Sequence, residues 1–286
     1  MSKSQIACFI SSTECSVVRL KTSGVTGYSL TDCKTLPFDL GDLNSGKGKR
    51  LLNKLGKHLE EWHDEELTLC VEPTVYYPLP AFFPANASRD ECKEYCRIEA
   101  GYFLTNPEKY SCDHTCYCDH AGSETLEKRL LLFYPDEECK TLALFLSSHH
   151  KIVFSGSIQL PLVCLSKFAE EPQVILELGN NSVLLSIARN GRIETFAYHK
   201  VKSREEMEYF AIKVLTENRV CRETDVQVAG TNSNKAMIAL LRRETSITFK
   251  ALGLPPSISL SNPQRFAVSS ASAVKAISAA LMALME

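Results

Sequence analysis

Three short apolar runs joined by two tight turns organise residues 174–200. The turns fall at Asn180-Asn181 and at Asn190-Gly191, because Asn and Gly tolerate the positive backbone angles of two-residue hairpin loops. The pattern therefore predicts a meander of three strands, with tight turns at both positions.

A helix and a further strand are predicted behind this meander. Ser203 and Glu206 have the spacing of a capping box. Apolar residues then recur at helical spacing, namely Met207, Phe210, Ala211, Val214 and Leu215. The apolar segment 226–230 predicts the next strand, and another helix follows it. The predicted order of elements is βββαβα.

The same order is predicted near the start of the chain. Residues 6–30 contain three short apolar runs, and residues 67–71 predict a later strand. Between them, the apolar residues of one helix face are Leu51, Leu52, Leu55, Leu59 and Trp62. Because an internal duplication fixes the structural unit before any single element is trusted, we expect residues 6–71 and 174–241 to form two similar cores facing each other across a cleft.

Additional elements lie between the repeats and after them. Prolines interleaved with aromatic residues over 73–84 predict an extended connection. Ser88 and Glu91 predict a capped helix to about Tyr102, and two strands and a helix follow before residue 148. At the end of the chain, Val274, Ile277, Leu281 and Leu284 predict a helix with one apolar face. We expect a first domain at 1–165, with an inserted subdomain at about 86–135, and a second domain at 166–286 that includes the last helix.

Two βββαβα units in tandem, with a small insert in the first, resemble the actin-like superfamily of sugar kinases, chaperone ATPases and actins. The insert, with its helix over Asp90–Tyr102 and later strands carrying Asp113 and ending at Tyr134-Pro135, is similar to that of the type IV pilus and cell-division branch. The chain also resembles uncharacterised actin-like proteins with degenerate nucleotide motifs. The resemblance implies an α/β fold of two duplicated ribonuclease H-type domains with mixed sheets, and an α+β insert in the first.

The resemblance also implies a site for ATP and magnesium in the cleft, but the first phosphate turn departs from the pattern. Active members carry an Asp, a Gly and a hydroxyl residue in this turn. Residues 10–16 contain neither Asp nor Gly. The turn therefore lacks a carboxylate directed at the metal and a glycine that lets backbone amides approach a phosphate.

The second phosphate turn is partly retained. Glu177 retains the carboxylate of the family's Asp on a longer side chain, Gly179 retains one of the two glycines, and Ser182 retains the hydroxyl. Asn181 replaces the second glycine. The segment that the resemblance associates with adenosine runs over 226–232. If a nucleotide binds, the predicted contacts are Glu177, Gly179, Asn181, Ser182, Gly230 and Thr231.

Composition excludes several classes of function. The formal net charge is -2, which gives no basic excess for binding nucleic acid or an anionic membrane. No apolar run approaches the roughly 18 residues of a membrane span, and no signal-peptide pattern opens the sequence. We expect a cytoplasmic protein whose 12 cysteines are mostly reduced and buried.

A cysteine- and histidine-rich stretch at 112–120 offers potential metal ligands. Cys112, His114, Cys116, Cys118 and His120 share one parity, so on a strand they face the same side. Structural zinc usually takes its ligands from tight turns instead. We interpret the stretch as a strand that packs on the helix carrying Cys92 and Cys96, and we expect no metal site.

These features favour a non-catalytic cytoplasmic scaffold or protein-binding module with a degenerate nucleotide site. The sequence identifies no catalytic residue, no cofactor and no particular protein partner. The alternative is a working ATP-binding ATPase or phosphotransferase that uses magnesium, and it would depend on Glu177.

Overall fold

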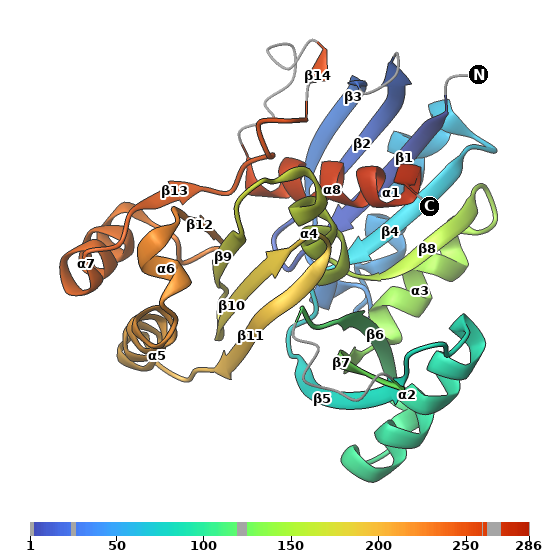
Figure 1. The fold of residues 1–286 in the computed structure, drawn as a ribbon. Coiled ribbons are helices and arrows are strands. Elements are labelled where there is room, and N and C mark those ends of the chain that lie inside the picture. Colours follow the sequence, from blue (N-terminus) through green and yellow to red (C-terminus); the bar gives the residue numbers. More distant parts are fainter. Residues whose placement is uncertain (1–2, 24–26, 119–124, 259, 262–269, 286) are drawn as a thin grey trace.

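A computed structural model describes residues 3–23, 27–118, 125–258, 260–261 and 270–285 (Figure 1). The first of its three sheets has the order β14-β3-β2-β1-β4-β8. Its strands are β1 (Ser4–Ile10), β2 (Glu14–Ser23), β3 (Gly27–Pro37), β4 (Glu66–Val71), β8 (Lys151–Ser157) and β14 (Leu260–Ser261). The second has the order β11-β10-β9-β12-β13. Its strands are β9 (Gln173–Leu178), β10 (Ser182–Arg189), β11 (Arg192–Lys200), β12 (Val226–Ala229) and β13 (Phe249–Ala251).

The two sheets repeat one topology. β1 is antiparallel to β2 and parallel to β4, which is parallel to β8. In the same way β9 is antiparallel to β10 and parallel to β12, which is parallel to β13. The order β3-β2-β1-β4-β8 thus corresponds strand for strand to β11-β10-β9-β12-β13. The predicted α/β fold with mixed sheets and a duplicated unit is confirmed.

A pair of helices covers the same face of each sheet. α1 (Gly48–Leu59) and α3 (Glu137–Leu146) pack on the first sheet, and Leu55, Leu59 and Trp62 are buried there as the spacing predicts. α5 (Arg204–Glu217) and α7 (Lys235–Thr245) bury the corresponding face of the second sheet. The shorter helices are α4 (Gln159–Leu165), α6 (Val220–Glu223), η1 (Leu40–Asp42), η2 (Glu60–Trp62), η3 (Pro107–Lys109) and η4 (Ser166–Phe168). Within the described ranges, none of the helices combines the length and the hydropathy of a membrane span.

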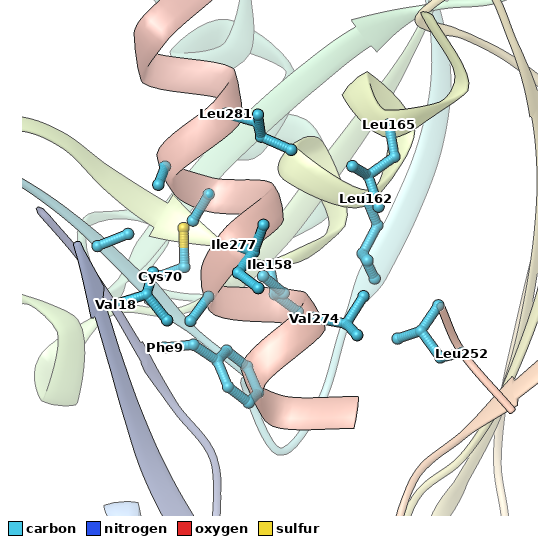
Figure 2. Packing of buried hydrophobic residues seen from close by; sticks show 14 of the residues in the cluster. Phe9, Val18, Cys70, Ile158, Leu162, Leu165, Leu252, Val274, Ile277 and Leu281 are labelled. Atoms are coloured by element: carbon cyan, nitrogen blue, oxygen red, sulfur yellow. The ribbon is translucent and has the colours of Figure 1, made fainter. Parts of the chain in front are cut away.

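The last helix, α8 (Ala271–Met285), lies in the centre of the molecule. It packs against β1, β2 and α4 (Figure 1). Figure 2 shows its Val274, Ile277 and Leu281 among side chains from the first sheet, from α4 and from the segment after β13. The prediction of a single apolar face is wrong, because residues 272–282 are buried all around the helix. Alanines such as Ala276 and Ala280 allow this close packing on every side. The predicted domain boundaries remain a prediction.

The insert forms the third sheet, in the order β5-β7-β6, from β5 (Tyr77–Pro84), β6 (Tyr110–Cys116) and β7 (Leu126–Pro135). α2 (Arg89–Phe103) packs on it through Cys92 and Cys96, and both hydrogen bonds of the Ser88–Glu91 capping box are present. The predicted extended connection is therefore partly a strand, which pairs along its whole length with β7. Its prolines are accommodated because β5 is an edge strand, where a missing N–H can face away from the ladder.

Two local predictions need correction. Asn190 and Gly191 have φ angles of 52° and 77°, as predicted, but neither Asn180 nor Asn181 has a positive φ. The turn after β9 has three residues, and the Gly179 N–H closes it by donating to the Ser182 carbonyl at 2.9 Å. Ser203 caps α5 by accepting from the Glu206 N–H, yet the Glu206 carboxylate accepts from the Lys202 N–H at 2.7 Å instead of returning to Ser203.

Asp113 on β6 joins the insert to the first sheet. Its buried carboxylate accepts hydrogen bonds from the Ser157 N–H at 2.6 Å and from the Tyr134 hydroxyl at 3.2 Å. Burial raises the pKa of Asp113 to about 6, although these two hydrogen bonds oppose the rise. The folded protein therefore binds the Asp113 proton more tightly than the unfolded chain does.

This raised pKa predicts a pH-dependent stability. An unfolded aspartate titrates near pH 4, so the contribution of Asp113 to stability is full below about pH 4 and is lost as the pH rises towards about 6. Asn at this position does not titrate. We therefore expect Asp113→Asn to gain stability relative to the wild type over this window, with a constant difference above it. Urea unfolding measured at several pH values tests this, and two parallel pH profiles would contradict it.

Candidate functional site

A cleft with a volume of about 270 Å³ lies between the two duplicated halves. It is lined by residues that directly follow parallel strands of both sheets, namely Ser11 after β1, Glu72 after β4, Gly179 after β9 and Gly230 after β12. Ligands of α/β sheets bind at the carboxyl ends of parallel strands. The position of the cleft therefore fits a ligand site, and the geometry of its walls decides which ligand can enter.

The first turn already uses its backbone amides. The Ser11 hydroxyl oxygen accepts hydrogen bonds from the N–H groups of Thr13 and Glu14, both at 3.2 Å. The Ser11 N–H in turn donates to the Glu14 carbonyl at 2.9 Å. The Thr13 and Glu14 amides are therefore not free to bind a phosphate at this turn. They are paired with a neighbouring side chain, which agrees with the absence of a glycine cradle in the sequence.

The second turn brings most of the predicted nucleotide contacts to the cleft. Five of them line it: Gly179, Asn181, Ser182, Gly230 and Thr231. The Thr231 hydroxyl donates to Asn180 Oδ1 at 2.7 Å, and Asn180 Nδ2 lies 3.4 Å from Ser12 Oγ on the first turn. The two turns thus contact each other across the cleft. A role of these residues in binding a cofactor remains a prediction.

Gly230 has a structural reason to be glycine. Its φ is +98°, and a Cβ atom there would lie 2.3 Å from the Leu178 carbonyl oxygen. The backbone conformation and the close approach of β9 each exclude a side chain. The glycine that ends the predicted adenosine strand is therefore explained by packing, whether or not a ligand binds.

Glu177, the sixth predicted contact, lies beneath the cleft and is engaged in a buried ion pair. Only 5% of its surface is exposed. Its Oε1 lies 2.5 Å from Nζ of Lys275 on α8, and its Oε2 accepts a hydrogen bond from Gln159 Nε2 at 2.5 Å. Lys275 Nζ also lies 2.8 Å from Oε1 of Glu72. One lysine, itself 3% exposed, thus connects a carboxylate from each half of the molecule.

The charge of this lysine is secured by its neighbours. Burial alone lowers the pKa of Lys275, but the carboxylates of Glu177 and Glu72 outweigh burial and hold that pKa above its ordinary value. The Phe9 ring lies 5.1 Å from the ammonium and adds a cation–π contact. The side chain is therefore an ammonium at neutral pH. A magnesium ion at Glu177 would meet a fixed positive charge a few ångströms away.

Reasoning from the sequence missed Lys275, Glu72 and Gln159 as members of this site. Glu72 and Gln159 carry no local signal, since both lie beside ordinary strand and helix patterns. Lys275 does carry one, because it is the single charged residue in the 15 residues of α8. A lone lysine within an otherwise uncharged helix indicates a buried charge with a partner elsewhere.

Within the cysteine- and histidine-rich stretch, His114 lies beside Arg129 on β7. Arg129 Nη1 donates to Cys92 Sγ at 3.2 Å and lies 3.3 Å from His114 Nδ1. A permanently charged guanidinium beside Cys92 and His114 disfavours a second cation there. Within the described ranges no three His, Cys, Asp or Glu side chains have a geometry that holds a metal ion. His120 lies outside those ranges, and the expected lack of a metal remains a prediction.

No protein-family model matches the sequence, and no curated protein matches it either. Among solved structures, the chain is similar to the PilM–PilN type IV pilus biogenesis complex, with a TM-score of 0.71 and 13% identity over 97% of this chain and 98% of that one. It is also similar to a Bacteroides thetaiotaomicron protein with an actin-like ATPase fold and unknown function, with a TM-score of 0.52 and 10% identity over 96% of this chain and 95% of that one. Together with the duplicated topology and the cleft between the sheets, these similarities confirm the predicted resemblance: the chain has the actin-like ATPase fold.

Proposed function

We propose that the protein is a non-catalytic, protein-binding scaffold built on the actin-like fold. The observation that carries the proposal is the ion pair between Lys275 and Glu177 beneath the cleft. The ammonium balances the one carboxylate that the second phosphate turn retains. In this proposal Lys275 takes the place of a metal ion and holds the two halves together without a nucleotide.

The electrostatics of the cleft support this proposal. Among the described residues that line it, the charged side chains are Glu14, Glu72 and Lys275, and Lys275 is paired. A triphosphate entering the cleft would meet two carboxylates without an unpaired cation. Because the Ser11 hydroxyl also occupies the amides of the first turn, the site offers little to compensate the phosphate charge.

A protein partner is the second part of the proposal. The similar structure with the higher TM-score is a complex of two proteins, PilM and PilN. That relationship belongs to those proteins. It supports, for this chain, a role in which a cleft fixed by an internal ion pair provides a rigid body for a partner to bind.

We expect Mg-ATP at millimolar concentration to leave the thermal unfolding of the protein unchanged, and ATP hydrolysis to stay at background. A ligand at 100 times its dissociation constant adds about 2.7 kcal/mol of stability, so tight binding would be easy to detect in a thermal shift assay. Buffer without nucleotide and magnesium alone serve as controls. A stabilisation that requires both ATP and magnesium would contradict the proposal.

The second candidate is an ATP-binding ATPase or phosphotransferase. It is favoured by the convergence of Gly179, Ser182, Gly230 and Thr231 on one cleft at the carboxyl ends of the strands. In that case Thr231→Val, which removes a hydroxyl from the cleft wall without touching the Lys275 ion pair, should abolish a nucleotide-dependent stabilisation.

A further inference from the structure

Four exposed cations form a basic stripe on the outward side of α1. They are Lys49, Arg50, Lys54 and Lys57. The last three are spaced four and then three residues apart, so they share one face of the helix. That face lies opposite Leu55 and Leu59, which are buried against the first sheet. The whole of α1 contains no acidic residue.

The charge of the basic stripe is not balanced by neighbouring side chains. Across the described ranges, its four cations take part in no ion pair. Lys47, which precedes α1, does pair with Asp42, at 3.2 Å. The chain has a formal net charge of -2, so the four stripe cations leave -6 on the remaining residues. Unpaired positive charge gathered on one helix of an otherwise acidic protein attracts an anionic partner.

The stripe also weakens the helix that carries it. Lys49 and Arg50 lie in the first turn, where the helix dipole disfavours positive charge. That turn holds no acidic residue, and Lys47 at the N-cap makes no side-chain capping hydrogen bond. Arg50 and Lys54 add a repulsion between like charges four residues apart. The stability of α1 therefore does not explain the stripe, whereas a bound anionic partner would relieve this repulsion.

Carboxylates at both ends of α1 limit the width of such a partner. Asp42 lies at the N-terminal end, and Glu60 and Glu61 follow the C-terminal end. Between them the stripe is about 12 Å long, from the rise of an α-helix per residue. A membrane or a nucleic-acid duplex is a broad anionic surface and would meet these carboxylates too. A single acidic polypeptide segment can follow the stripe and avoid them.

An exposed leucine beside the stripe also favours a polypeptide partner. α3 lies close along α1, since a Cβ atom on Gly56 would lie 3.3 Å from the Phe145 ring. Lys57 follows this glycine and Leu144 precedes this phenylalanine, so both lie where the two helices approach each other. Leu144 is 76% exposed. An apolar side chain of a peptide can cover it, whereas a phosphate backbone cannot.

We propose that the basic stripe binds an acidic segment of a partner protein. Asp and Glu side chains of the segment pair with the four cations, and an apolar side chain packs on Leu144. As a site for the partner, the stripe rests on the proposed scaffold function, but the two proposals fail separately. Mg-ATP binding in the cleft would count against the scaffold function alone, because the stripe makes no use of the cleft.

A random-peptide phage library selected on the full chain supplies the probe. We expect the enriched peptides to carry an excess of Asp and Glu together with an apolar residue. A synthetic copy of one enriched peptide should bind roughly tenfold more weakly to the double variant Arg50→Glu, Lys54→Glu, because two attractive pairs become repulsive. Leu144→Ser should weaken binding about threefold and leave its salt dependence unchanged, because no charge is altered.

The double variant Lys93→Glu, Arg97→Glu is the matched control, because it reverses one lysine and one arginine at the same spacing on α2. It should bind the peptide like the wild type. The stripe variant should unfold at no lower urea concentration than the wild type, because it places an acid in the first turn of α1. Enriched peptides without an acidic excess would overturn the proposal, as would equal affinity for the wild type and the stripe variant. Stripe-dependent binding of duplex DNA, or of vesicles containing phosphatidylserine, that is tighter than binding of the peptide would also overturn it.

Discussion

Replacing Lys275 with methionine is expected to lower the free energy of unfolding by about 3–5 kcal/mol, the usual cost of removing one partner of a buried ion pair. Methionine fills a similar volume, so the main loss is the charge. Glu177 would be left buried without a cation, and Glu72 would lose its contact with α8. Because these contacts join both halves of the molecule, the effect should reach the whole fold. Urea unfolding followed by the fluorescence of Trp62, the single tryptophan, measures it.

Two matched variants separate the ion pair from other effects. Lys93→Met removes an exposed lysine that lies 2.9 Å from Asp90 on α2, and such surface pairs contribute at most about 1 kcal/mol. The double variant Lys275→Met, Glu177→Gln removes both charges and should regain most of the lost stability. If the double variant is as unstable as Lys275→Met alone, packing rather than charge explains the loss.

Gly230→Ala is the second variant with a large expected effect. The positive φ of Gly230 is strained for alanine, and the new Cβ would lie 2.3 Å from the Leu178 carbonyl oxygen, which belongs to the backbone and cannot turn away. We expect a loss of at least about 2 kcal/mol. The measurement is again urea unfolding, followed by circular dichroism, because Gly230 lies in the second half of the chain.

Gly191→Ala is the control for this variant. Gly191 also has a positive φ, of +77°, but its Cβ would meet the Lys167 side chain, which is flexible. The strain of the backbone is then present with a clash that the exposed Lys167 side chain can relieve by turning into solvent. A loss near 1 kcal/mol is expected. Equal losses at both glycines would show that the close approach of β9 to Gly230 does not matter.

The repeated topology could be predicted from the sequence because many of its strands and helices have signals in the local sequence. The apolar runs of residues 174–200, the Asn190-Gly191 turn and the Ser88–Glu91 capping box depend on neighbours in the sequence. The order of these elements, found twice, then indicated the fold. The identity of β5 could not be found this way. Its prolines exclude a central strand, and only its pairing with β7 makes it the edge of a sheet.

The site was harder to predict because its central contact is not local. Glu177 and Lys275 are far apart in the sequence and meet only because α8 passes between the two halves. The apolar spacing of α8 indicated one buried face, and it gave no sign that the remaining faces are buried too. The resemblance pointed to Glu177 as the retained carboxylate, and in the structure this carboxylate is paired with Lys275. Its role as a nucleotide or magnesium contact remains a prediction.

We propose that the Lys275 ion pair has replaced magnesium and nucleotide in the cleft, and titration calorimetry with Mg-ATP tests this proposal. We expect no binding tighter than roughly 1 mM, or about 4.1 kcal/mol of binding free energy, for the wild type and for Thr231→Val alike. A micromolar dissociation constant that weakens in Thr231→Val or in Glu177→Ala would contradict it and establish the cleft as a nucleotide site.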